Sequence, residues 1–171
     1  MSERASYAPC SGCGAPVPQS EGPTHKYVVA SPGCWAVYGT LLAREYGDFH
    51  YPAVHRLTVD AYMAQHPGNA EHDRRQRQSV AVHLCALCLA IEGGLPLPQV
   101  TEELGRLTRQ RSDWPLLSAP LSPHWLTVVD VIGAADLADH TARVERWARS
   151  VWEAWAPHHA TIRQWATGVP R

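Results

Sequence analysis

Five cysteines and several histidines are the residues of this chain whose types and spacing could do chemistry. Cys10 and Cys13 lie in PCSGCGAP, where two thiols separated by two residues and followed by glycine form the knuckle that wraps a zinc ion. Glycine lets the backbone turn tightly enough for amide groups to face the sulfurs. A frayed tail with two incidental cysteines is the alternative, but this proline-rich segment has little else to order it.

Cys34 is the predicted third ligand. It lies in SPGCW, at the expected start of a helix, where the positive helix terminus stabilises the thiolate form that zinc requires. A lone cysteine beside a tryptophan can instead fill a hydrophobic core, and this interpretation stays open.

His66 is the first choice for the fourth ligand. Two helices of similar length with a short connection are expected to pack antiparallel, which places Cys34, at the start of the first, beside the end of the second. The segment QHPG puts His66 at that end. His25, in the intervening loop, is the second choice, whereas His55 falls at the far end of the hairpin.

Cys85 and Cys88 also have the two-residue spacing and could complete a four-cysteine site with the first pair. They stand in HLCALCLAI, among apolar neighbours, where a thiolate is costly and cysteine behaves as a small hydrophobe. We therefore interpret them as core residues.

A second polar cluster is predicted from four residues: His55, Asp60, Tyr62 and His83. A turn at about residues 67–72 connects the predicted helices 52–66 and 73–92. His55 lies before this turn by about as many residues as His83 lies after it, so the two imidazoles could meet across the pair of helices. Together with a carboxylate they could bind a second metal or perform acid–base catalysis. The alternative is a set of histidines that join helices through hydrogen bonds, a common role for polar residues inside bundles.

Hydrophobic periodicity predicts that these residues are positioned by an all-α fold, a single-domain bundle of five or six helices. We expect an irregular metal-binding arm over residues 1–33, rich in proline and glycine, and a helical bundle over 34–171. Helices are predicted at about 34–46, 52–66, 73–92, 97–109 and 140–156, with a short one within 126–137 and a last turn or two after Pro157.

Composition limits the function classes. The 171 residues suit one domain. Fifteen basic and sixteen acidic residues give a net charge near −1 without a sustained basic stripe, so no nucleic-acid partner is expected. No apolar leader or membrane-length segment is present, which predicts a cytoplasmic protein without a membrane partner. The number of cysteines is odd, and in such a reducing compartment their paired spacing points to metal or redox chemistry more than to structural disulfides.

The segments CSGC, GPTHKY, SPGCW, HRLTVDAYMAQHPG and SVAVHL together resemble an uncharacterised bacterial family of unknown function. The resemblance covers nearly the whole chain and is most specific in its middle portion. It implies that these segments form one set and that LCALCL is a local departure from the family pattern. It implies no activity and no catalytic residues.

The sequence therefore predicts a zinc-binding helical protein whose metal is structural and which acts as a binding or regulatory module for an unidentified protein or small-molecule partner. The alternative is a metal-dependent enzyme of the hydrolase or thiol transferase type. It would use either an open position at the zinc or the second polar cluster. The number of protein ligands discriminates between the two, because four close the coordination shell.

Overall fold

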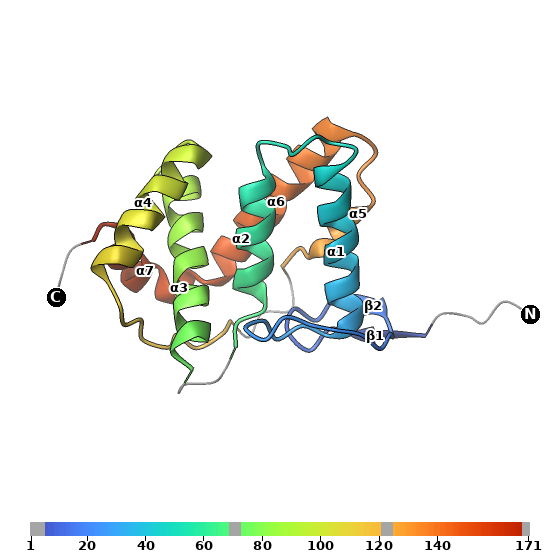
Figure 1. The fold of residues 1–171 in the computed structure, drawn as a ribbon, viewed down its shortest axis with the longest axis horizontal. Coiled ribbons are helices and arrows are strands. Elements are labelled where there is room, and N and C mark those ends of the chain that lie inside the picture. Colours follow the sequence, from blue (N-terminus) through green and yellow to red (C-terminus); the bar gives the residue numbers. More distant parts are fainter. Residues whose placement is uncertain (1–5, 69–72, 121–124, 169–171) are drawn as a thin grey trace, which may run out of the picture.

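The computed structural model describes residues 6–68, 73–120 and 125–168, and it confirms the all-α class (Figure 1). The described residues form seven α-helices, one more than predicted because the segment after Pro157 makes a helix of its own. The helices are α1 Pro32–Tyr46, α2 His55–Gln65, α3 Arg74–Leu87, α4 Leu97–Gln110, α5 Val128–Ile132, α6 Leu137–Ala154 and α7 His159–Ala166.

The N-terminal arm contains a small sheet that the sequence pattern did not predict. Strands β1 (Tyr7–Pro9) and β2 (Pro16–Pro18) pair antiparallel, with Ala8 opposite Val17. Each strand has only three residues, so the sheet amounts to a tight hairpin whose turn carries the CSGC segment. The arm reaches the end of α2 through an isolated bridge between Val28 and Pro67.

Helices α1 and α2 run in opposite directions, as the short connection between them predicts (Figure 1). Ser31 caps α1 by accepting a hydrogen bond from the backbone N–H of Cys34 (3.4 Å). The rings of Tyr38 on α1 and Tyr62 on α2 stack with centroids 3.7 Å apart. The start of α1 therefore lies with the end of α2 next to the arm, and the opposite ends meet at the loop of residues 47–54.

Helix α3 packs against α2, α4, α6 and α7, which agrees with its apolar second half. It continues into a π-helix, Cys88–Glu92, before the chain turns at Gly93. Cys85 and Cys88 are free thiols buried in this core, and burial raises the pKa of Cys88 to about 11. Their interpretation as core residues agrees with this placement.

Buried tryptophans fix how α6 sits against α2. Trp147 donates its indole N–H to Oε1 of Gln65 (2.8 Å), and Trp155 donates to the backbone carbonyl of Ala64 (3.2 Å). Gln65 in turn donates to the carbonyl of Leu126 (2.6 Å). All three of these side chains are fully buried, so each polar atom needs the partner that it finds.

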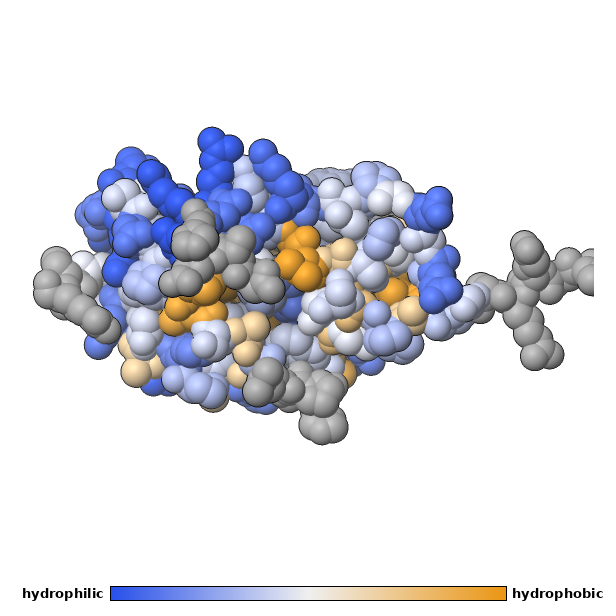
Figure 2. Space-filling view, turned by 90° about the horizontal axis from the view of Figure 1, so that it is seen from below, coloured by the Kyte–Doolittle hydropathy of each residue, from blue (hydrophilic) through white to orange (hydrophobic). Residues whose placement is uncertain are grey.

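The face seen from below in Figure 2 shows apolar residues as separate orange areas among hydrophilic ones. Among the described helices, none is long and apolar enough to cross a membrane.

Replacing Trp155 with Ala should lower the free energy of unfolding by about 3–5 kcal/mol, because it removes a fully buried ring and its hydrogen bond and leaves a cavity. Urea unfolding followed by circular dichroism measures this. Leu137→Ala, at a residue 45% exposed, is the control and should change stability by no more than about 0.5 kcal/mol. Equal losses in both variants would contradict the packing described for α6.

Candidate metal centre

Four side chains from three separate elements converge at one end of the α1 and α2 pair. Cys10 and Cys13 come from the hairpin of the arm, Cys34 from the first turn of α1, and His66 from the C-cap position of α2. All four are buried, with exposed fractions of 4% or less. These are the four residues that the sequence analysis selected as metal ligands.

Three of the distances between the ligand atoms match those of a tetrahedral zinc site. The Sγ atoms of Cys13 and Cys34 are 3.9 Å apart, and Nε2 of His66 lies 3.6 Å from Sγ of Cys10 and 3.5 Å from Sγ of Cys34. Zinc bonds of about 2.3 Å to sulfur and about 2.0 Å to nitrogen place tetrahedral ligands roughly 3.8 Å (S to S) and 3.5 Å (S to N) apart. The four atoms all lie within 4.8 Å of one another, so one ion could contact all of them.

The three thiols interact strongly because they share one buried space. Hydrogen bonds from Cys13 and Cys34 hold the pKa of Cys10 well below its usual range. Hydrogen bonds with Cys10 and Cys34 raise the pKa of Cys13, and the hydrogen bond with Cys10 raises the pKa of Cys34 to about 12. One thiolate is thus stabilised by two neighbouring thiols, and a divalent cation would stabilise all three thiolates.

Neighbouring groups already orient the ligand atoms. Nδ1 of His66 donates to the backbone carbonyl of Tyr62 (2.7 Å), which leaves Nε2 with its lone pair toward the sulfurs. Backbone N–H groups of Gly12 and Ser31 donate to Sγ of Cys10 at 3.5 and 3.4 Å. The phenol of Tyr62 donates to Sγ of Cys34 (3.5 Å). Such contacts fix ligand orientation and stabilise negative charge on sulfur.

Gly12 is required by the close approach of the arm to α2. A Cβ atom there would lie 2.1 Å from the carbonyl oxygen of Val29 and 2.6 Å from Cδ2 of His66. A side chain at this position would therefore push the hairpin away from the histidine. On the other side of the hairpin, the indole N–H of Trp125 donates to the carbonyl of Cys13 (2.9 Å).

The other candidate ligands lie elsewhere. His25, the second choice for the fourth position, is exposed, and its Nδ1 accepts from the backbone N–H of Tyr27 (3.3 Å). Cys85 and Cys88 are in the core beside α4 and α7. Among the described residues, the group of Cys10, Cys13, Cys34 and His66 is the one set of His, Cys, Asp or Glu side chains arranged to hold a metal ion.

The second polar cluster is divided among three contacts. His83 donates from Nδ1 to Oδ1 of Asp60 (2.7 Å), which agrees with the expected bridge between helices. His55 donates instead to Glu45 (2.7 Å), and Tyr62 belongs to the metal centre. The two imidazoles are therefore held by different carboxylates, and the described residues do not form a second metal-binding group there.

Glu45 and His140 are the polar residues that sequence reasoning missed. Glu45 is fully buried near the end of α1 and accepts hydrogen bonds from His55 (2.7 Å), Thr58 (2.6 Å) and Nε2 of His140 (2.7 Å). A signal was available, because Glu45 follows the buried Leu41 by four residues on one helix face. Its partner His140 is 95 residues away in the chain and could not be paired with it by spacing.

Residues 8–156 match the model of a family of unknown function, DUF5946. This range contains all four residues of the metal centre. The expected resemblance to a family of unknown function is thereby confirmed. Neither the curated proteins nor the solved structures contain a match to the chain.

Glu45→Gln should destabilise the protein by about 2 kcal/mol near neutral pH, because buried hydrogen bonds to a charged group each contribute about 1.5–3 kcal/mol. Burial alone would raise the pKa of Glu45, but the bonds from His140, Thr58 and His55 outweigh burial and lower it. A lowered pKa stabilises the fold above the unfolded pKa, and this stabilisation is lost as pH falls through the folded pKa.

Urea unfolding of both proteins over a pH series measures the effect. The difference between wild type and Glu45→Gln should be greatest near neutral pH and shrink under acid conditions. Glu145→Gln, an exposed glutamate on α6, is the control and should show little difference at any pH. A difference for Glu45→Gln that does not change with pH would contradict an ionised Glu45.

Proposed function

We propose that this chain, which belongs to the DUF5946 family of unknown function, holds one structural zinc ion through Cys10, Cys13, Cys34 and His66 and acts as a binding or regulatory module. The observation that carries the proposal is the near-tetrahedral convergence of three buried sulfurs and one imidazole nitrogen. Residues 6–33 are then the metal-binding arm of a single helical domain.

The donor set favours zinc. Thiolates and imidazoles suit zinc, whereas magnesium and calcium take oxygen ligands. Zinc sites with four cysteine or histidine ligands are typically structural, because four protein ligands leave no position for water or substrate. A zinc-dependent hydrolase would need such an open position. The closed ligand set therefore supports the structural role over the catalytic alternative.

The composition of the arm supports a metal ion that holds it in place. Few of its side chains are apolar and buried, and its two strands have three residues each. Such a segment gains little from hydrophobic burial to offset the entropy lost on ordering. Metal binding contributes directly to folding, with apparent values of about 10–16 kcal/mol for zinc-finger peptides. We infer that the ion fastens the hairpin to α1 and α2.

The metal content of the purified protein tests this proposal. We expect one zinc per chain by elemental analysis, and strong loss of zinc in Cys13→Ala and His66→Ala, because each removes one of the four ligands. Chelation of the wild type should lower the melting temperature and speed hydrogen exchange in residues 6–33. Cys88→Ala, which removes a core thiol outside the site, is the matched control and should keep its zinc.

Two outcomes would contradict a structural zinc site. One is wild-type protein, purified without chelators, that contains no stoichiometric metal. The other is a melting curve and an exchange pattern that do not change when the metal is removed.

Tyr62→Phe should weaken zinc binding by about 10-fold or more while keeping one zinc per chain, since it deletes the hydroxyl that donates to Sγ of Cys34 and leaves the ring stack. Competition against a chelator of known affinity measures this. Tyr38→Phe removes the hydroxyl of the other stacked ring, which makes no hydrogen bond to the sulfurs, and is the control. Equal zinc affinity in wild type and Tyr62→Phe would show that the Tyr62 hydroxyl does not contribute to metal binding.

A further inference from the structure

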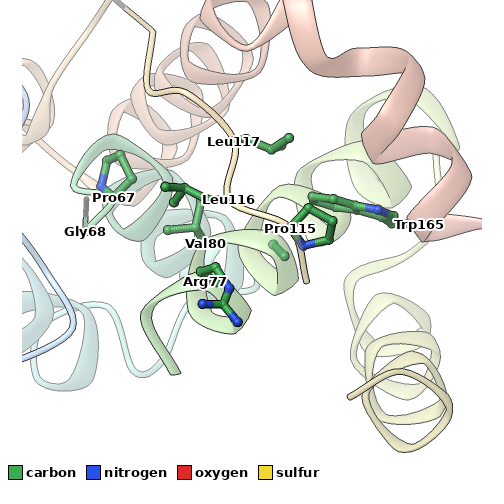
Figure 3. Close-up of a pocket in the computed structure, with 9 residues that line it drawn as sticks. Pro67, Gly68, Arg77, Val80, Pro115, Leu116, Leu117 and Trp165 are labelled. Atoms are coloured by element: carbon green, nitrogen blue, oxygen red, sulfur yellow. The ribbon is translucent and has the colours of Figure 1, made fainter. Parts of the chain in front are cut away.

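A pocket of about 360 Å³ lies where the start of α2 faces the start of α4, at the end of α2 opposite the metal centre. Its volume is in the range of small-molecule sites. The small pocket drawn in Figure 3, between Pro67, Val80, Leu116 and Trp165, holds only about 10 Å³, enough for a single water. A neighbouring surface pocket of about 370 Å³, which reaches α6 at Arg149, is similar in size. The pocket at the start of α2 is the one whose lining includes Arg56.

The lining of this pocket has two chemical parts. His55, Arg56 and Tyr51 contribute polar groups, and Pro52, Leu97 and Pro98 contribute apolar surface. The ring of Tyr51 lies against His55 with centroids 4.6 Å apart. A mostly apolar wall with a few convergent polar groups is the usual composition of a small-molecule site.

Both basic side chains of the pocket are anchored from behind by fully buried carboxylates. His55 donates from Nδ1 to Glu45 (2.7 Å), and Arg56 donates from Nε to Oδ2 of Asp60 (2.8 Å). Asp60 is held on its other oxygen by His83 (2.7 Å). Burying a carboxylate is costly, and apolar side chains of similar size would serve packing at least as well. Two buried carboxylates behind one pocket therefore indicate a role in orienting the His55 and Arg56 side chains toward it.

The bond that anchors Arg56 leaves donors for a ligand. Among the described residues, no hydrogen bond engages the two Nη atoms of Arg56, which are the pair that can bind an anion bidentately. Nδ1 of His55 donates to Glu45, so its Nε2 carries the lone pair and accepts from the phenol of the exposed Tyr46 (3.3 Å). The guanidinium is thus fixed through Nε and keeps its terminal edge available.

The backbone beside the pocket is in an unusual conformation. His50 and Tyr51 have φ values of +52° and +60°, which residues other than glycine rarely adopt. Two successive residues of this kind cost free energy, and such conformations cluster at ligand sites. Here they place the Tyr51 ring against His55 at the edge of the pocket.

We propose that this pocket binds a small organic anion. Its carboxylate or phosphate group pairs with the Nη atoms of Arg56, and its apolar part lies against Pro52, Leu97 and Pro98. Asp60 and Glu45 act as positioning residues, because each contacts a side chain of the pocket and not the ligand. This site is independent of the metal centre, which lies at the other end of α2.

Calorimetric titration of the full chain tests the proposal with defined probes. Benzoate and phenyl phosphate present an anion on an apolar ring and distinguish a carboxylate site from a phosphate site. Benzyl alcohol lacks the charge, and inorganic phosphate lacks the ring. We expect saturable binding of one equivalent of at least one of the two aromatic anions, at least about 10-fold tighter than either of the other probes.

Three variants locate the binding. Arg56→Gln removes the guanidinium, and Thr101→Trp fills the pocket from an exposed position on α4 without touching the buried carboxylates. Each should weaken binding at least about 10-fold. Arg149→Gln, on α6 in a neighbouring surface hollow, is the matched control and should bind like wild type. Melting curves check that each variant is folded, and Thr101→Trp decides the result if Arg56→Gln is not.

The proposal is overturned by any of three results. These are no saturable binding of either aromatic anion, binding of benzyl alcohol as tight as that of the anions, or unchanged binding in folded Thr101→Trp protein. Zinc content should be the same in all variants, since none is a metal ligand.

Discussion

Three sulfurs and an imidazole share one buried space, and this is the constraint on which the N-terminal half of the structure depends. The three sulfurs cannot all be thiolates there without a cation, and the four groups cannot move apart without releasing the arm from α1 and α2. Gly12 shows how close the contact is, because even a Cβ atom would strike Val29 and His66. The arm, the capped start of α1 and the end of α2 are therefore positioned by one another.

Much of the fold could be predicted from the sequence, because the information was local. Apolar periodicity located the long helices to within a few residues, and Pro32 and Gly47 stand at the ends of α1. The antiparallel packing of two helices then brought Cys34 and His66 together, although they are 32 residues apart. Here a local pattern and a simple packing rule were sufficient to select four residues that the structure places side by side.

The remaining features depend on contacts that no local pattern reports. Glu45 bonds to His140, which lies on α6 near the other end of the chain. It also bonds to His55, and the sequence analysis had not identified this carboxylate as a partner of His55. The hairpin of the arm has strands too short to show a period of two.

Helix α2 links the two candidate sites of the protein. Its first turn carries His55 and Arg56, its last turn carries Tyr62, and His66 caps its end, so one rigid element spaces the pocket and the metal centre.

The order in which the ligands occur along the chain affects how the protein is made. A ribosome releases the two thiols of the hairpin first, whereas His66 follows Cys10 by 56 residues and Trp125 follows Cys13 by 112. Until His66 has been added, the thiols of the hairpin lack their fourth partner, and free thiols are open to oxidation. The arm therefore cannot close onto α1 and α2 through all four ligands before the segment through His66 has been synthesised.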